Sequence, residues 1–563
     1  MKKIIIVFCF NLFLVHLFAQ PEQIKGVFAD TAIVVTAHPE ASNIGLQILK
    51  NGGNAFDAAV AVEFALAVCY PAAGNIAGGG FLVYRLEDGS TGALDYREKA
   101  PALAHRNMYL DKDGNVLSNR TTEGCLSVGV PGTVAGMIEI HKIFGTLLFK
   151  DLIQPAIDLA CSGVVLTEKE AAGLNKFRDS LLKYNHYVPH LVKNDGMLWQ
   201  PGDTLKHIDL ANTLERIRDS GRSGFYEGVT ADLILEEMKA GGGIITREDL
   251  MNYKAVWRNP VVGYYKGNKI ISMCPPSSGG IALIQLLGMV EKYDIGKFGF
   301  NKTKTIQVMV EAERRVYADR AAHLGDPDYY YVPVTQLLNN KYLESRMNNF
   351  SFEKATPSNE IKAGTFNDNE STETTHYTIV DAKWNAVVAT TTLNTRYGSK
   401  VVVKGGGFLL NNQMDDFSIK PGFPNAYGLV GGEANAIAAN KRMLSSMTPT
   451  IIEREGKLFM TVGTPGGSTI ITSVFQTVLN VLEHKMTAQD AVNARRFHHQ
   501  WLPDEITAED NAFDDYVLNE LTKLGYKIKN VPEIGRVEAV MVLPDGRLEG
   551  AADPRGDDKA VGY

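Results

Sequence analysis

The amino-acid sequence predicts a layered α/β protein in which helices bracket antiparallel sheets. Two observations support this prediction. Helical periodicity dominates the first two thirds of the chain, and β-rich alternation takes over from residue 374 onward. In addition, no Pro/Ser-rich linker, single-sign charge run or solenoid repeat divides the chain. A length of 563 residues would suggest about three or four domains, but no boundary between them is visible.

The N-terminal part is predicted to begin with a strand and two helices. Residues 34–39 read as a strand that leads into a helix at about 41–50. Gly52 and Gly53 end that helix, and another begins over 57–68. Further helical patterns occupy residues 152–174, 205–217, 229–239, 281–290 and 305–322.

The C-terminal part is predicted to begin with a hairpin. Residues 376–380 and 386–392 have the composition of strands, and residues 381–385 form a plausible hairpin loop between them. A further strand is expected over 458–463, and residues 470–483 read as an apolar helix.

The net charge and the N-terminal segment restrict the class of binding partner and the cellular location of the protein. The net charge of −7 argues against nucleic acid or an anionic membrane surface as partner. Two lysines followed by an apolar run over 4–18 are typical of a signal peptide, here residues 1–19. An uncleaved anchor is the alternative, although the run is short for a membrane span. We therefore expect export, to the periplasm or beyond the cell.

Cysteine and histidine usage indicates no metal centre and no disulfide framework. Four cysteines remain after the leader, in apolar or small-residue contexts without CxxC pairing, and are expected to be buried thiols: Cys69, Cys125, Cys161 and Cys274. His498 and His499 are adjacent in an expected strand, so their side chains would point to opposite faces, and we interpret them as structural.

The most informative segment is a polar stretch that runs into a strand at Thr374. Residues 367–373 contain no apolar anchor, and the β-rich run begins directly afterwards. If the bond between Glu373 and Thr374 is cut, Thr374 carries a hydroxyl nucleophile and its own α-amine as base. The junction therefore predicts a self-processing hydrolase or transferase, although a threonine at the start of a strand is common without any such role.

Several short motifs extend this interpretation. In the C-terminal part they are Thr-Thr-His-Tyr at 374–377, Leu-Asn-Thr at 393–395, Asn-Asn-Gln-Met-Asp-Asp-Phe at 411–417, Leu-Ser-Ser-Met at 444–447 and Pro-Gly-Gly-Ser at 465–468. In the N-terminal part they include Asn-Gly-Gly-Asn-Ala-Phe-Asp at 51–57, Gly-Gly-Gly-Phe at 78–81 and Asp-Tyr-Arg-Glu-Lys-Ala-Pro at 95–101. Taken together, in this order and at this spacing, they resemble the gamma-glutamyltransferase (gamma-glutamyltranspeptidase) family over essentially the whole mature chain.

The resemblance implies a fold, a maturation event and a reaction. The fold is the four-layer αββα sandwich of N-terminal-nucleophile hydrolases, formed jointly by a large subunit (20–373) and a small catalytic subunit (374–563) that remain together as a heterodimer. The reaction is cleavage of the gamma-glutamyl amide of glutathione and related compounds through an acyl-Thr374 intermediate. The acyl group then passes to water or to an amino acid or peptide. No cofactor is required.

Catalytic roles follow from the resemblance and from local chemistry. Thr392 matches the threonine that orients the nucleophile, although a strand threonine needs no such explanation. Gly466 and Gly467 precede an apolar helix and can turn their N–H groups toward one point, as an oxyanion hole requires. A plain helix-entry turn capped by Ser468 is the alternative for this pair.

Substrate-binding roles follow in the same way. A gamma-glutamyl donor carries an α-carboxylate and an α-ammonium, so its site needs a fixed cation and a fixed anion. The resemblance assigns the carboxylate to Arg97, Ser445 and Ser446, the ammonium to Asp416, Asn394 and Gln413, and a closing lid to Tyr427. Taken singly, each of these residues is better explained by a surface salt bridge or a turn cap.

Two other functions remain open from the sequence. The first is a related acylase, of the glutaryl-cephalosporin or poly-gamma-glutamate type, with the same nucleophile and a different acyl pocket. Asp416 argues against it, because an acyl group without an ammonium would leave this carboxylate unpaired. The second is a solute-binding protein that retains glutamate-like ligands without turnover, in which the oxyanion donors would have no task.

Overall fold

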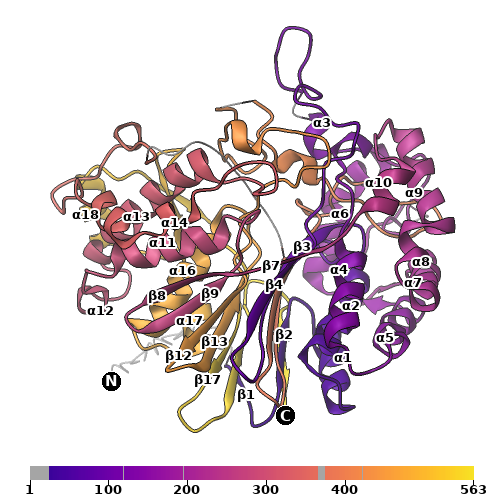
Figure 1. Cartoon of the computed structure of the whole chain (residues 1–563), viewed down its shortest axis with the longest axis horizontal. Helices are drawn as coiled ribbons and strands as arrows, with labels where there is room; N and C mark the ends of the chain where they lie inside the picture. The colour runs from indigo at the N-terminus through magenta and orange to yellow at the C-terminus, as the bar shows by residue number, and fades with distance from the viewer. Residues whose placement is uncertain (1–24, 118, 194–195, 365–374, 421) are drawn as a thin grey trace, which may run out of the picture.

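Two face-to-face β-sheets lie between two layers of helices in the computed structural model, so the protein is a four-layer αββα sandwich (Figure 1). The structure describes residues 25–117, 119–193, 196–364, 375–420 and 422–563. The expected signal peptide, Glu373 and Thr374 lie outside these residues. The sequence-based prediction of a layered α/β fold is confirmed.

In the part of the chain that the structure describes, each sheet has seven antiparallel strands. The first, called sheet A here, has in spatial order β1 (Val27–Ala29), β18 (Leu548–Ala551), β17 (Glu538–Val542), β13 (Lys457–Gly463), β12 (Thr450–Arg454), β9 (Asn268–Ser272) and β8 (Val261–Tyr265). Sheet B has β19 (Lys559–Gly562), β2 (Ile33–Thr36), β10 (Thr375–Val380), β11 (Ala386–Thr392), β3 (Gly79–Arg85), β4 (Thr91–Asp95) and β7 (Val256–Arg258).

Both halves of the chain contribute to both sheets. Strand β10, the first element after residue 374, lies in the middle of sheet B, paired with β2 on one side and β11 on the other. β11 in turn pairs with β3. A cut before Thr374 would therefore leave strands of the two products hydrogen-bonded side by side, so the products would stay associated.

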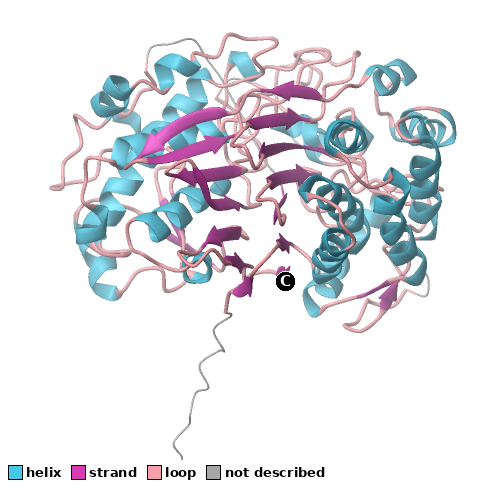
Figure 2. Ribbon diagram, turned by 60° about the horizontal axis from the view of Figure 1, so that its bottom comes forward, coloured by secondary structure: helices cyan, strands magenta, loops and turns pink. Residues whose placement is uncertain are grey.

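Helices cover the outer face of each sheet (Figures 1 and 2). On sheet B lie α1 (Pro39–Lys50) and α2 (Ala55–Cys69), with α4 (Thr133–Phe144), α5 (Phe149–Ser162), α6 (Glu168–Lys183), α7 (Ile208–Ser220) and α9 (Gly228–Gly241) outside or beside them. On sheet A lie α11 (Gly279–Val290), α13 (Thr303–His323) and α16 (Thr469–Leu482), with α18 (Asp515–Lys523) at the periphery. All 15 residues of α2 are buried, as expected for a helix that is apolar on every side.

The two sheets approach each other closely where β10 begins. The Thr378 hydroxyl on β10 donates to the Thr461 hydroxyl on β13 at 2.7 Å. Beside it, the His376 ring packs on Gly463, where an added Cβ would lie 2.1 Å from a ring atom. Gly463 ends β13, directly before the Pro-Gly-Gly-Ser motif. This contact therefore brings that motif close to the start of β10.

Most predicted elements are confirmed, including the hairpin. Asp381 Oδ1 accepts from the N–H groups of Lys383 and Asn385, which closes the turn between β10 and β11. The prediction of one helical stretch over 152–174 is wrong. Gly163, at φ +96°, ends α5, and a capping box of Thr167 and Glu170 starts α6. That Ser/Thr-x-x-Glu pattern was a usable sequence signal.

One cysteine differs from expectation. Cys69, Cys125 and Cys274 are buried free thiols, as predicted, but Cys161 is exposed. It lies in the last turn of α5, where the neighbouring Ala160 takes the buried face. A small-residue context does not reveal which side of a helix faces water. Among the described residues, no helix combines the length and apolarity needed to cross a bilayer.

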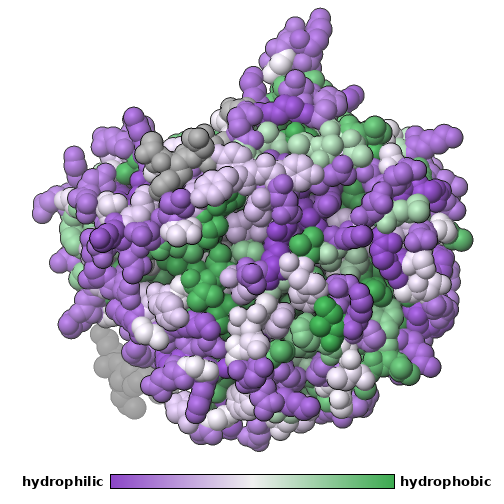
Figure 3. All heavy atoms as spheres, viewed as in Figure 1, coloured by the Kyte–Doolittle hydropathy of each residue, from purple (hydrophilic) through white to green (hydrophobic). Residues whose placement is uncertain are grey.

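Many hydrophilic residues lie at the surface, in keeping with the charged composition of the chain. On the face shown in Figure 3, hydrophilic residues dominate the periphery and hydrophobic residues gather toward the middle, where Figure 1 shows the sheets.

Candidate active site

The start of β10 lies next to the end of β11. Thr375 pairs with Thr391, and Thr392 is the last residue of β11. The chain therefore enters sheet B beside Thr392 immediately after the predicted nucleophile. The Thr392 hydroxyl accepts a hydrogen bond from the Asn394 N–H at 2.7 Å, which leaves its own hydrogen available for another acceptor. This position suits a residue that orients Thr374.

Arg97 and Asp416 form a fully buried ion pair. Arg97 follows β4, and Asp416 ends a short 3-10 helix, η3 (Gln413–Asp416). Arg97 Nη2 donates to Asp416 Oδ2 at 2.5 Å, and both side chains are 0 % exposed. The predicted carboxylate-binding cation and ammonium-binding anion are thus adjacent. Side by side, they present the two charges that complement the zwitterion of an α-amino acid.

A further carboxylate lies near this pair. Glu98 Oε2 is 3.6 Å from Arg97 Nη1, and its side chain is also fully buried. Burial raises the pKa of Glu98 to about 7, and the neighbouring Arg97 opposes that rise. Proton uptake at Glu98 therefore changes the charge around Arg97 near neutral pH.

Two amides supply neutral acceptors beside Asp416. Gln413 Nε2 donates to Asp416 Oδ2 at 2.5 Å, and Asn394 Nδ2 donates to the Asn412 carbonyl at 3.0 Å. The side-chain oxygens of both residues are buried and have no hydrogen-bond partner among the described residues. Asn394 also adopts φ +74°, a left-handed conformation that asparagine tolerates better than most residues. Both oxygens are suited to accept from an ammonium group.

Ser445 and Ser446 lie beside the same arginine. Arg97 donates from Nε to the Met443 carbonyl at 3.3 Å and from Nη2 to the Leu444 carbonyl at 3.1 Å. The two serines follow directly and are fully buried. The structure thus brings together the four segments that the sequence assigned to substrate binding around residues 97, 394, 413–416 and 443–446.

The Gly466–Gly467 pair forms the entry to α16. Their φ angles are +134° and +67°, outside the range that side-chain-bearing residues prefer. Ser468 makes no side-chain cap hydrogen bond, so the plainer explanation as a serine-capped turn is not supported. Gly466 and Gly467 lie at the N-terminus of α16, where the helix dipole favours negative charge.

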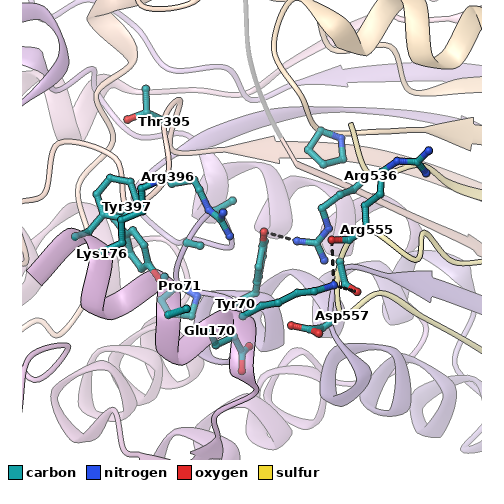
Figure 4. Close-up of a pocket in the computed structure, with 18 of the residues that line it drawn as sticks. Tyr70, Pro71, Glu170, Lys176, Thr395, Arg396, Tyr397, Arg536, Arg555 and Asp557 are labelled. Carbon is teal, nitrogen blue, oxygen red and sulfur yellow. Dashed lines mark hydrogen bonds between the residues drawn. The ribbon is translucent and has the colours of Figure 1, made fainter. Parts of the chain in front are cut away.

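Tyr427 connects the expected lid loop to the wall of a large pocket. Its hydroxyl donates to the Asn394 carbonyl at 3.2 Å. Tyr427, Asn394 and Gly466 all line this pocket, which has a volume of about 930 Å³. Residues of α6, such as Glu170 and Lys176, and of the C-terminal segment, such as Arg555 and Asp557, also line it (Figure 4).

Three positioning residues were not found from the sequence. Arg320 on α13 donates to the Ser446 hydroxyl at 2.9 Å. Asn411 Oδ1 accepts from the Gln413 N–H at 3.0 Å and so holds the start of η3. Asp415 accepts from the Thr121 hydroxyl at 2.7 Å and the Ala426 N–H at 3.1 Å. An arginine within a long helical pattern gives no signal of such a contact.

The contacts of His498 and His499 indicate a structural role. His498 Nδ1 lies 2.9 Å from the Thr472 hydroxyl, and His499 Nε2 lies 3.4 Å from Asp504 Oδ1. Burial lowers the pKa of each ring to about 4. Within the described part of the chain, no three His, Cys, Asp or Glu side chains cluster in a way that would hold a metal ion.

Comparison with known proteins agrees with this geometry. The family model described as Gamma-glutamyltranspeptidase matches residues 41–563. A glutathione hydrolase proenzyme from Escherichia coli K12 is 46 % identical over 538 residues, which cover 95 % of this chain and 93 % of that protein.

Solved structures agree as well. The crystal structure of Helicobacter pylori gamma-glutamyltranspeptidase superposes with a TM-score of 0.58 at 48 % identity, and covers 58 % of this chain and 94 % of that one. A cephalosporin acylase from Bacillus halodurans superposes with a TM-score of 0.86 over 98 % of this chain and 99 % of that one; at 24 % identity it supports the fold alone. The structural neighbours confirm the N-terminal-nucleophile sandwich, and the chain belongs to the gamma-glutamyltranspeptidase family of enzymes.

Proposed function

We propose that this protein cuts its own chain before Thr374 and then transfers gamma-glutamyl groups from glutathione and related compounds to water, amino acids or peptides. The observation that supports this most is the buried Arg97–Asp416 pair with the acceptor oxygens of Gln413 and Asn394 beside it. These groups complement an α-carboxylate and an α-ammonium on one carbon. A gamma-glutamyl group carries both.

The chemistry starts with the new N-terminus. The freed α-amine of Thr374 has an unperturbed pKa of about 7.7–8.0, so it can accept the hydroxyl proton near neutral pH. The hydroxyl oxygen then attacks the gamma-carbonyl carbon, and the amide nitrogen leaves with a proton. Thr392 orients the nucleophile. Water or an amine next attacks the ester carbon, and the proton returns to the Thr374 oxygen.

The remaining residues act on the acyl group. The N–H groups of Gly466 and Gly467 stabilise the oxyanion of each tetrahedral intermediate. Arg97, with Ser445 and Ser446, holds the α-carboxylate, and Asp416 with Asn394 and Gln413 holds the ammonium. Tyr427 closes the lid loop over the bound glutamyl group, which orders the donor and excludes water.

The precursor is expected to be divided into three parts. Residues 1–19 are a signal peptide, residues 20–373 the large subunit and residues 374–563 the small catalytic subunit. The exported enzyme works in the periplasm, or outside the cell, as a heterodimer of the two subunits.

Denaturing electrophoresis and N-terminal sequencing test self-processing. Purified wild-type protein should give two bands, the smaller beginning at Thr374, and Thr374→Ala should give one band without activity. Fully active wild-type protein in which residues 373 and 374 remain joined would refute the mechanism.

Donor preference tests the substrate class against the acylase alternative. Gamma-glutamyl and glutaryl anilides differ only in the ammonium group. We expect the gamma-glutamyl anilide to be turned over much faster, because the glutaryl group leaves Asp416 without its ammonium partner. Equal rates, or a preference for the glutaryl anilide, would favour the acylase.

A further inference from the structure

The pocket next to the glutamyl-binding residues is much larger than a glutamyl group needs. Its volume of about 930 Å³ lies near the upper end of the range for small-molecule sites, about 300–1,000 Å³. Arg97 and Asp416 are fully buried and do not line it, whereas Asn394, Tyr427 and Gly466 form its inner wall. The pocket therefore lies on the side of the scissile bond from which the amine leaves or arrives.

Most charged side chains that line this pocket form hydrogen bonds or ion pairs with other residues of the protein. Arg536 donates to Asp558 Oδ2 from both Nε and Nη2, at 2.9 and 2.5 Å. It also donates to the Tyr70 hydroxyl at 2.6 Å (Figure 4). Arg555 pairs with Glu509 and Asp553. These two arginines hold the C-terminal segment against the rest of the protein, so their charges are compensated.

Other polar groups that line the pocket also have partners within the protein. Glu170 Oε1 is 3.0 Å from His38 Nε2, and Lys169 Nζ donates to the carbonyls of Arg555 and Gly556. Asp557 Oδ2 accepts from the Thr167 hydroxyl at 2.9 Å. In Figure 4, Asp557 and Arg396 lie on opposite sides of the pocket.

Two cations and one carboxylate, Glu533, remain among the charged side chains that line the pocket. Lys176 on α6 and Arg396 in the loop after β11 are exposed and line the pocket. Neither makes an ion pair with any residue that the structure describes. In Figure 4 both lie beside Tyr397, and the Arg396 side chain extends toward the middle of the pocket. An unpaired positive charge at this place attracts a negatively charged ligand.

The position of Arg396 sets the size of that ligand. Arg396 is two residues beyond Asn394, which lies at the glutamyl-binding site. The chain turns here, with Asn394 at φ +74° and Tyr397 at φ +61°, so the Cα atoms of Asn394 and Arg396 are at most about 7 Å apart. A dipeptide has a similar length between its amino nitrogen and its carboxylate. With the nitrogen at the acyl carbon, its carboxylate would reach the region of Arg396.

We propose that Arg396, assisted by Lys176, binds the terminal carboxylate of the peptide on the amine side of the reaction. This inference rests on the proposed function and adds the residues that would recognise the free C-terminal carboxylate of an acceptor. The same contact holds the peptide that leaves a glutathione-like donor. Arginine suits this role because its planar guanidinium can bind a carboxylate through two hydrogen bonds.

The test removes a cation from the enzyme and, separately, the carboxylate from the acceptor. Transfer from a gamma-glutamyl anilide is measured with glycylglycine and with glycylglycinamide, in wild type, Arg396→Gln and Lys176→Gln. For wild type, the amide should have a KM about tenfold higher than glycylglycine, the size expected for loss of a charged hydrogen bond. Arg396→Gln should raise the KM of glycylglycine about tenfold and leave the KM of the amide near the wild-type value. Lys176→Gln should show the same pattern with a smaller change.

A matched control is Lys354→Gln, which removes an exposed lysine away from the pocket and should leave both KM values unchanged. Two-band processing verifies that each variant folds. If Arg396→Gln affects glycylglycine and its amide equally, or affects neither, the carboxylate contact is refuted. If wild type releases no anilide at all, the proposed function fails instead, and the two failures are distinguishable.

Discussion

Arg97 and Asp416 are 319 residues apart in the sequence, yet Arg97 Nη2 lies 2.5 Å from Asp416 Oδ2 with both side chains removed from solvent. Such a buried pair is costly to desolvate, and removal of one partner leaves an uncompensated charge. Each partner of the pair thus holds the other in place until a substrate zwitterion binds between or beside them. The first two predictions follow from this arrangement.

Arg97→Lys should weaken donor binding while it keeps the positive charge. A lysine ammonium cannot replace a guanidinium that contacts Asp416 and two backbone carbonyls at once. We expect kcat/KM for a gamma-glutamyl anilide to fall about 100-fold, mainly through KM. Steady-state kinetics measure this. Processing into two bands should persist, and a kcat/KM within twofold of wild type would contradict the assigned role.

Asp416→Asn should act selectively on donors that carry an ammonium group. Loss of the negative charge removes its attraction for the ammonium, which we expect to lower kcat/KM for the gamma-glutamyl anilide about 100-fold. The glutaryl anilide lacks that group, so its much lower rate should not fall further. An equal loss with both anilides would mean that Asp416 acts only by holding Arg97.

Gly466→Ala should lower kcat with little effect on KM. The residue adopts φ +134°, which side-chain-bearing residues rarely adopt, and an added Cβ would lie 2.7 Å from Thr469 Oγ1 and 3.1 Å from Gly535 Cα, so alanine strains this turn. Displacement of an oxyanion donor typically costs about 100–1,000-fold in rate. Gly456→Ala is the matched control: its φ is +76°, and nothing lies within 4 Å of an added Cβ. That variant should lose about 1–2 kcal/mol of stability, because an L-residue is strained at positive φ, and should keep its kcat.

Tyr427→Phe should raise the donor KM about 2- to 10-fold. The change removes the hydrogen bond from the Tyr427 hydroxyl to the Asn394 carbonyl, worth about 0.5–1.5 kcal/mol, and so favours an open lid. Tyr516→Phe, at a side chain that is 70 % exposed, serves as control. Donor kinetics that are indistinguishable between the two variants would argue against a lid held by Tyr427.

Glu63→Gln should stabilise the protein increasingly as the pH rises. Glu63 is fully buried in α2, and burial raises the pKa of its carboxyl from 4.5 to about 8. The folded chain therefore binds more protons than the unfolded chain in this range, so wild type loses stability between pH 4.5 and 8. The loss is at most about 1.4 kcal/mol per pH unit. Thermal unfolding should show Tm values for wild type and variant that are close at pH 5 and separate by pH 8.

The matched control for this pH effect is Glu40→Gln on the neighbouring helix α1, where the glutamate is exposed. Its Tm difference from wild type should not change with pH. If the difference between wild type and Glu63→Gln also stays constant from pH 5 to pH 8, Glu63 is ionised in the folded protein and the prediction is wrong.

Many of the secondary-structure elements were predictable because they depend on residues that are close together in the sequence. The alternation of residues 376–380 and 386–392 predicted the hairpin, because period-two patterns and a turn-forming Asp and Asn act within a few residues. Helices such as α11 and α13 were found for the same reason. The split between α5 and α6 was missed because the apolar pattern continues across Gly163, although the capping box at Thr167 marks the new helix start.

The motifs of residues 374–377, 393–395, 411–417, 444–447 and 465–468 identified the family and its αββα fold from the sequence alone, since side-chain types and spacing are written directly in the chain. Only the tertiary structure decided which charges lie together and which are free. Arg97 meets Asp416, and Arg320 meets Ser446, while Arg536 is bound to Asp558, and Arg396 at the pocket makes no ion pair with any described residue. Contacts between residues hundreds of positions apart depend on the packing of two sheets, and no local pattern encodes that packing.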